Sequence, residues 1–339
     1  MDIGRLNDRC RDASLTLASQ NSLIVLAGCA EPHLTNDWDL KDLLGLERLS
    51  AATIEAVLDE AASFKKSPSP ELLAGRTVAF LFSEASTRTR SSFEAAALRL
   101  GAEVLSFSAA GSSLAKGETM LDTMLNLQAV GVTHFVVRHE RSGVLEDLAP
   151  RVKACVINAG DGWHEHPTQA LLDLMTLRER WGSFKGRKLV ILGDIRHSRV
   201  ARSNLFALKK LGAKVVFCGP TPLVPDAFAA LGATVEHDIE KALKGADAVN
   251  VLRLQLERME QGFVTSLSDY AHAYQLTPAR AALMKPEALV LHPGPMNRGV
   301  EISSEVADGP RSVILEQVAN GVFVRMAALA LCEQGRARG

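Results

Sequence analysis

The feature that most constrains this sequence is a regular alternation, from Asp37 onward, of short apolar runs and segments with the period of a helix. The apolar runs are rich in Val, Leu, Ile and Phe. They occupy residues 77–82, 103–107, 133–137, 154–157, 188–192, 214–217, 247–252 and 288–291. Strands that alternate with helices form parallel sheets covered by helices on both faces. The alternation therefore predicts an α/β fold.

The length predicts two domains, because the chain has 339 residues and single hydrophobic cores stop growing at about 250–300 residues. No repeat or low-complexity linker marks a boundary, so we place it near residue 165 from the motifs on either side. The segment from 312 to about 335 spaces apolar residues four apart, which predicts a long amphipathic helix that packs back on the first domain. Those residues are Ile314, Val318, Val322 and Met326.

Charge and cysteine content exclude several classes of partner. The net charge of −1 and the pI of about 6.8 provide no field that would attract nucleic acid or an anionic membrane. No apolar run approaches the ~18 residues that span a bilayer. The five cysteines are odd in number, widely spaced and without a C-x-x-C motif, which is typical of unpaired thiols in a reducing, cytoplasmic compartment. They are Cys10, Cys29, Cys155, Cys218 and Cys332.

The N-terminal segment contains "SLIVLAGCA" at residues 22–30, which ends like a lipoprotein cleavage site. Its apolar run is too short for a signal peptide, and acidic residues precede it. We expect residues 1–36 to be a poorly ordered extension.

The stretch "FLFSEASTRTRSSFE", residues 80–94, predicts a strand that turns sharply into a helix near Thr87. Such a turn presents free backbone N–H groups and the positive end of the helix dipole. Ser86, Thr87 and Thr89 add hydroxyl donors, and Arg88 and Arg90 add guanidinium groups that suit phosphate or carboxylate oxygens. We interpret this stretch as a phosphate-binding turn; the alternative is a solvated helix start with surface arginines.

The stretch "NAGDGWHEHPTQALLDL", residues 158–174, has Pro167 where a helix begins, so His166, Thr168 and Gln169 project from a helix N-terminus. His164 and His166, with His139 and His197 elsewhere, also permit a metal site. No carboxylate or thiolate follows a zinc-site spacing, so we expect no metal.

Other expected strand ends carry polar or basic groups. The helix start after residue 192 carries Arg196, Arg199 and Arg202 and lacks the G-x-G-x-x-G of a dinucleotide site. Arg253, Gln255 and Arg258 follow the strand at 247–252. "SSLAKGE" at 112–118 is a polar loop, and the Pro and Gly residues of "LHPGPMNRGVEI" at 291–302 fix a tight loop.

These motifs occur in a specific order. S-T-R-T-R, S-x-x-x-K-G-E, V-R-H, H-P-T-Q, R-x-Q-x-E-R and H-P-G-P, over about residues 38–335, resemble the transcarbamoylases, and among them the aspartate carbamoyltransferases. The resemblance implies two similar domains, each a parallel sheet flanked by helices, linked by two interdomain helices. It implies a carbamoyl-phosphate-binding domain of residues 37–165 plus 312–339, and an aspartate-binding domain of 166–311. It further implies transfer of the carbamoyl group of carbamoyl phosphate to L-aspartate, in de novo pyrimidine biosynthesis, without a cofactor.

The resemblance also assigns roles to residues. Carbamoyl phosphate would be held by Ser86, Thr87, Arg88, Thr89, Arg138, His166, Gln169, Pro293 and Gly294, and aspartate by Lys116, Arg199, Arg253 and Gln255. The catalytic groups among these would be Arg88, Thr89, Lys116, Arg138 and His166. Glu84 would pair with Arg199 and Arg258 on domain closure. Ser112 and Lys116 would reach a neighbouring subunit's site in a homotrimer, although Ser113 makes the choice of serine ambiguous.

Two other functions are compatible with part of this pattern. Ornithine carbamoyltransferase shares the phosphate turn and H-P-x-Q, but it carries H-C-L-P where this chain has His292-Pro293-Gly294-Pro295, and Lys116 and Arg253 favour a dianionic acceptor. A non-catalytic binding subunit would be expected to lack at least one charged site residue, and all are present. The last loop and the N-terminal extension resemble bacterial members that assemble with a dihydroorotase or a dihydroorotase-like chain.

Overall fold

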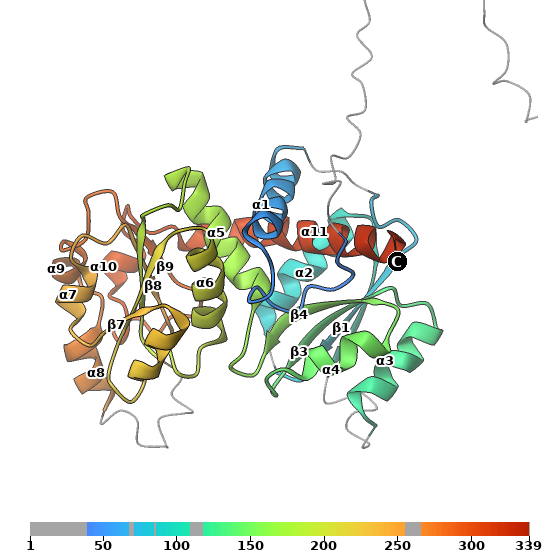
Figure 1. Ribbon diagram of the computed structural model, residues 1–339, viewed down its shortest axis with the longest axis horizontal. Coiled ribbons are helices and arrows are strands. Elements are labelled where there is room, and N and C mark those ends of the chain that lie inside the picture. The colour runs from blue at the N-terminus through green and yellow to red at the C-terminus, as the bar shows by residue number, and fades with distance from the viewer. Residues whose placement is uncertain (1–38, 68–70, 85, 109–117, 255–265, 339) are drawn as a thin grey trace, which may run out of the picture. The chain divides into compact units, whose positions relative to one another are not determined.

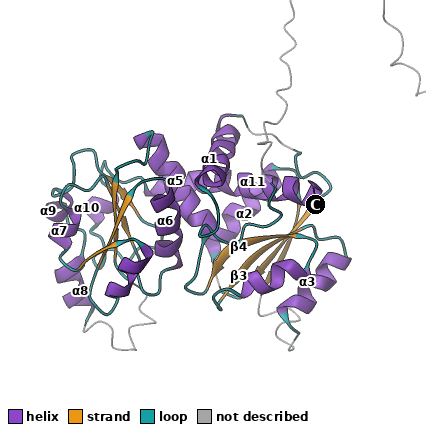
Figure 2. Cartoon of the chain, viewed as in Figure 1, coloured by secondary structure: helices purple, strands orange, loops and turns teal. Residues whose placement is uncertain are grey.

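The computed structural model describes residues 39–67, 71–84, 86–108, 118–254 and 266–338. Within these ranges the chain forms two parallel sheets (Figures 1 and 2). Parallel pairing requires a crossover between successive strands, and helices or loops supply it. The predicted α/β fold with two helix-flanked sheets is confirmed.

The first sheet has the strand order β2-β1-β3-β4. Its strands are β1 (Thr77–Phe82), β2 (Glu103–Ser108), β3 (His134–His139) and β4 (Cys155–Asp161). The residues of β1 alternate between two buried layers, as the period of a strand requires. Phe80 belongs to the apolar cluster that contains Phe93, whereas Leu81 belongs to the cluster that contains Met124 and Leu145. Both faces of the sheet are therefore covered.

The helices of these two layers come from different parts of the chain. One layer contains α1 (Ala51–Lys66), α2 (Thr87–Arg99) and the C-terminal α11 (Ile314–Arg338), and the other contains α3 (Met120–Ala129) and α4 (Val144–Leu148), as Figure 1 shows. A short 3₁₀ helix (Ala149–Arg151) follows α4. Ser50 caps α1 by accepting from the backbone N–H of Thr53, a role that serine favours at the start of a helix.

The second sheet has the order β7-β6-β5-β8-β9. Its strands are β5 (Lys188–Leu192), β6 (Lys214–Cys218), β7 (Thr234–Glu236), β8 (Ala248–Val251) and β9 (Leu289–Leu291). Its helical elements are α5 (Pro167–Trp181), α6 (Arg199–Lys210), a 3₁₀ helix (Asp226–Leu231), α7 (Ile239–Leu243), α8 (Leu267–Tyr274), α9 (Pro278–Ala281) and α10 (Ser304–Ala307). Strand β7 was not predicted, because three residues with only one aliphatic side chain are too short to give a strand pattern.

Helices α5 and α11 connect the two halves by packing against each other. Helix α11 also packs on α1 and α2, so the predicted return of the C-terminal helix to the first sheet is confirmed. By length and hydropathy α11 could cross a membrane, but most of its apolar stretch is buried in the protein. Its composition is that of a core helix enclosed by other elements.

Each sheet has one point where the strand order reverses. In the first sheet β1 lies between β2 and β3, and in the second β5 lies between β6 and β8. Crevices at the carboxyl ends of strands next to such a reversal are where open α/β sheets bind ligands. A ligand-binding site is therefore expected where the chain leaves β1, β3, β5 and β8.

Candidate active site

The phosphate-binding turn predicted at residues 86–89 is the N-terminus of α2, directly after β1. Ser86 is the N-cap, yet its side chain caps no helix N–H; its hydroxyl instead lies 3.2 Å from an Arg138 nitrogen that donates to it. Thr87 and Arg88 are exposed, and Thr89 is buried. We expected Arg90 to add a second guanidinium group to the turn beside Arg88. Its guanidinium lies instead over the Phe82 ring, 5.5 Å from the centroid.

Arg138 enters this turn from β3, the strand next to β1. Its Nε donates to Glu84 Oε2 over 3.0 Å. Burial, and then the positive charge of Arg199, lower the pKa of Arg138 to about 10. The guanidinium is therefore charged at neutral pH and is held by Glu84 and Ser86 at the end of the sheet.

Arg199 is the first residue of α6, after β5, and it binds the same carboxylate. One of its guanidinium nitrogens donates to Glu84 Oε2 over 2.7 Å. Burial alone would raise the pKa of Glu84, but its interactions with Arg199 and Arg138 outweigh burial and lower the pKa. The predicted pairing of Glu84 with Arg199 is present, and the additional pairing with Arg138 was not anticipated.

Gly160, near the end of β4, gives Arg199 the space that it occupies. Its φ of +117° lies in the left-handed range, and a Cβ built there would approach the Arg199 Nε to 2.9 Å. Only glycine combines this backbone conformation with so close a neighbour. No local pattern in the sequence indicates this contact with Arg199.

Arg88 lies close to Gly294 and within electrostatic range of Arg253. A Cβ at Gly294, whose φ is +64°, would lie 3.1 Å from the Arg88 Cζ. Burial, and then the charge of Arg253, lower the pKa of Arg88, which places the two guanidinium groups within electrostatic range. Pro293 and Gly294 follow β9, and the Gly294 N–H donates to His292 Nδ1 over 2.8 Å.

His166 and Gln169 lie at the start of α5, as predicted. His166 is the N-cap of α5 and is 4% exposed, and its backbone N–H donates to the Ser203 hydroxyl over 2.9 Å. Its Nδ1 has no hydrogen-bond partner among the described residues. Gln169 is buried, and its side-chain nitrogen donates to Asp173 over 3.0 Å.

The site therefore gathers four guanidinium groups and one carboxylate at the carboxyl ends of strands. They belong to Arg88, Arg138, Arg199, Arg253 and Glu84. One carboxylate balances one positive charge, so positive charge predominates among these five residues. Such a site suits a ligand with several negative charges and would stabilise negative charge that develops in a reaction.

Four predicted site residues lie outside the described residues. They are Ser112, Lys116, Gln255 and Arg258. The alternative Ser113 lies outside as well. Their roles stay predictions.

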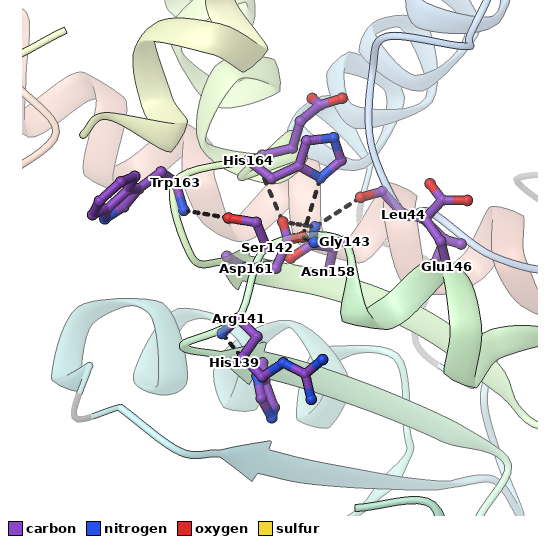
Figure 3. A network of polar contacts seen from close by, with 12 residues as sticks. Leu44, His139, Arg141, Ser142, Gly143, Glu146, Asn158, Asp161, Trp163 and His164 are labelled. Carbon is purple, nitrogen blue, oxygen red and sulfur yellow. Dashed lines mark hydrogen bonds and ion pairs between the residues drawn. The ribbon is translucent and has the colours of Figure 1, made fainter. Parts of the chain in front are cut away.

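The histidines considered for a metal site have separate partners (Figure 3). On the turn after β4, the Nδ1 of His164 lies 3.1 Å from the Oδ2 of Asp161. Asp161 also accepts from the Gly143 N–H and the Asn158 side chain. His139 accepts from the backbone N–H of Arg141. His197 pairs with Asp194. Within the described residues, each of these three histidines therefore has its own local hydrogen-bond partner.

A group with metal-ligand chemistry lies at the other end of the first sheet. His134 and Cys155 begin β3 and β4, and their ligand atoms and that of Glu333 lie within 4.8 Å of one another. Glu333 already pairs with Arg76 and Arg336, each at 2.7 Å, so two guanidinium groups occupy its carboxylate. Burial raises the pKa of Cys155 to about 12, which keeps the thiol protonated. We interpret the group as a buried ion-pair cluster.

Comparison with known proteins decides the family. Residues 41–179 match the sequence profile described as "Aspartate/ornithine carbamoyltransferase, carbamoyl-P binding domain", and residues 185–332 match the "Asp/Orn binding domain" of the same family. The chain belongs to the aspartate/ornithine carbamoyltransferase family. The first matched segment ends within α5, and the second begins in the loop between α5 and β5. The domain boundary near residue 165 stays a prediction.

Relatives within the carbamoyltransferase family are similar over nearly their whole length. The aspartate carbamoyltransferase catalytic subunit of Gemmatimonas aurantiaca is 53% identical over 304 residues, which cover 87% of this chain and 94% of that protein. The catalytic subunit of the same name from Myxococcus xanthus is 55% identical, with 86% and 99% covered.

Solved structures of carbamoyltransferases share the fold. Aspartate transcarbamoylase of Trypanosoma cruzi in complex with carbamoyl phosphate and aspartate has a TM-score of 0.79 and 31% identity, with 88% of this chain and 99% of that chain covered. Ornithine carbamoyltransferase of Pyrococcus furiosus has a TM-score of 0.76 and 33% identity, with 86% and 96% covered. The fold is therefore shared by enzymes named for either acceptor.

The burial of His166 leads to a prediction about its protonation. Burial, and then the positive charge of Arg199, hold its pKa well below 6.5. The folded protein should keep the imidazole neutral while the unfolded chain gains a proton below pH 6.5. This contribution to stability is therefore complete above pH 6.5 and is lost as the pH falls further.

We expect the ¹⁵N shifts of the His166 ring to stay constant between pH 6 and 8 in an NMR titration of histidine-labelled protein. His237 is the control, because the carbonyl of Gly219 and the carboxylate of Asp226 raise its pKa and it should titrate in this window. A midpoint near 6.5 for His166 would contradict the buried environment described above.

Proposed function

We propose that this chain transfers the carbamoyl group of carbamoyl phosphate to the amine of L-aspartate, giving N-carbamoyl-L-aspartate and phosphate. The observation that carries the proposal is the cluster of four guanidinium groups with one carboxylate at the start of α2 and the neighbouring strand ends. Carbamoyl phosphate and aspartate are both anions, and each has two or more oxygens that guanidinium groups can bind. Relatives named for this activity are more than 50% identical to the chain.

The chemistry needs positioning and charge stabilisation. The amine nitrogen attacks the carbonyl carbon, the bond from that carbon to the phosphate oxygen breaks, phosphate leaves, and the amine loses a proton. Negative charge grows on the carbonyl oxygen as the amine attacks, and the guanidinium of Arg138 and the helix N–H groups after Ser86 suit that charge. Holding the two substrates together contributes a further large part of the acceleration.

The charge of the site favours aspartate over ornithine as the acceptor. Arg199 and Arg253 suit the two carboxylates of aspartate, whereas the second amine of ornithine would meet a surplus of positive charge. The expected Lys116 would add to this surplus. Ornithine is therefore the acceptor that this arrangement disfavours.

We further propose that the chain works in the cytoplasm, in pyrimidine biosynthesis, as a homotrimer with shared active sites. The S-x-x-x-K-G-E motif supports the shared sites, because in the family Ser112 and Lys116 reach the neighbouring subunit. The last loop and the N-terminal extension support assembly with a dihydroorotase or a dihydroorotase-like chain. Sedimentation analysis of the chain, alone and with such a partner, tests both proposals.

The function is tested by supplying the purified chain with carbamoyl phosphate and either L-aspartate or L-ornithine. We expect carbamoyl-amino-acid formation with aspartate and at most trace formation with ornithine. Turnover with ornithine alone would overturn the acceptor, and binding of carbamoyl phosphate without any turnover, with or without a partner chain, would overturn the catalytic function.

A further inference from the structure

A buried carboxylate that no site prediction included lies one helical turn beyond Gln169. Asp173 has no solvent exposure, and it accepts four hydrogen bonds from side-chain amides. Oδ1 accepts from Gln169 (3.0 Å) and Gln317 (2.7 Å), and Oδ2 accepts from Asn204 (2.8 Å) and Asn250 (3.0 Å). All the hydrogen bonds that a carboxylate can readily accept are thus made to amide nitrogens.

The four amides come from four elements, three of which carry or lead to site residues. Gln169 lies on α5 beside His166, Asn204 lies on α6, which begins with Arg199, and Asn250 lies on β8, which leads to Arg253. Gln317 lies on α11, and its oxygen accepts from the backbone N–H of His292, just before Pro293 and Gly294. Asp173 is therefore connected by hydrogen bonds to Gln169 and, through Gln317, to the backbone of His292, while it stays out of contact with solvent.

Asp173 can act only as an acceptor when it is ionised. Burial raises its pKa to about 6, and the amide hydrogen bonds counteract part of that rise, so the group is largely ionised at pH 7 and above. A carboxylate facing an amide requires the NH₂ end of that amide. The Gln169 amide is thereby fixed with its nitrogen towards Asp173, and its oxygen makes no hydrogen bond to the described residues.

The orientation of Gln169 has a consequence for the donor substrate. A carbamoyl group ends in NH₂, which donates hydrogen bonds, whereas the acetyl group of acetyl phosphate ends in a methyl group of similar size, which donates none. We infer that Asp173 is a positioning residue that fixes the Gln169 amide with its oxygen available to the carbamoyl NH₂, and that it thereby selects carbamoyl phosphate over acetyl phosphate. This inference rests on the proposed function, together with the expectation that Gln169 holds carbamoyl phosphate.

The test compares the affinities of three probes for the wild-type chain and the Asp173→Asn variant, measured by calorimetry without aspartate. Asparagine keeps the shape but replaces one acceptor oxygen with a donor, so the amides around it can no longer all keep their orientation. We expect carbamoyl phosphate to bind about tenfold more weakly to the variant, the effect of one lost hydrogen bond. Acetyl phosphate and inorganic phosphate should bind within about twofold of wild type, because neither has an NH₂ group to donate.

The matched control is Thr176→Val on the same helix. Thr176 is also fully buried, and its hydroxyl donates to the Leu172 carbonyl and accepts from Asn320, away from Gln169. It should affect stability without changing the ratio of carbamoyl phosphate to acetyl phosphate affinity. If Asp173→Asn does not fold, Asp173→Ser is the second variant and the same ratio decides.

The outcomes separate this inference from the proposed function. A wild-type chain that binds carbamoyl phosphate no better than acetyl phosphate and transfers no carbamoyl group would overturn both. A wild-type chain that is active and selective, with a variant of unchanged selectivity, would overturn the role of Asp173 alone. Equal weakening of all three probes would also overturn it, because it would show general damage to the site.

Discussion

Replacing Arg138 with methionine is expected to lower kcat by about 10²- to 10³-fold, the usual effect of removing one donor that stabilises a developing oxyanion. Arg138 is the guanidinium that joins the two neighbouring strand ends of the first sheet: it leaves β3 and meets Ser86 and Glu84, which follow β1. Methionine keeps most of the length and apolar surface of the side chain but removes its charge and its donors.

The measurement is the steady-state rate with carbamoyl phosphate and aspartate, together with the melting temperature of each variant. Arg141→Met is the matched control, because Arg141 is exposed and lies three residues beyond Arg138. It should change kcat less than about twofold. A kcat for Arg138→Met within threefold of wild type would show that Arg138 does not contact the reacting group.

Replacing Gly160 with alanine is expected to raise the KM for aspartate about tenfold or more. The new Cβ would lie 2.9–3.1 Å from guanidinium atoms of Arg199, which is the mobile end of a long side chain and will move rather than block folding. Arg199 would then lose its position beside Glu84, and the site would lose one of its carboxylate-binding groups. The φ of +117° adds a strain of about 1–2 kcal/mol to the folded state.

Gly182→Ala separates the two effects. Gly182 also has a positive φ, of +70°, but a Cβ there would meet no atom within 4 Å. Urea unfolding should therefore show a similar loss of stability in both variants, with an unchanged KM for aspartate in Gly182→Ala. The position assigned to Arg199 would be wrong if Gly160→Ala lost stability but kept the wild-type KM for aspartate.

Much of the fold could be predicted because its signals are local. The apolar run at 77–82, the cap at Ser50 and the proline at 167 each specify an element through the conformation of a few neighbouring residues. Strand β7 was missed because its three residues become a strand only by pairing with β6. The buried thiols of Cys155, Cys218 and Cys332 are free, as their spacing predicted.

The sequence alone indicated several of the residues that gather at the strand ends, among them Arg88, Arg138 and His166, because motifs such as S-T-R-T-R and H-P-T-Q mark strand ends and helix starts. Only the tertiary structure decided their partners: Glu84 holds both Arg138 and Arg199, Gly160 makes room for Arg199, and Asp173 binds amides from four elements. The Arg199–Glu84 and Gln317–Asp173 contacts join residues more than 100 positions apart. Such pairings depend on strand order and on how α5 and α11 pack, and no local pattern contains that information.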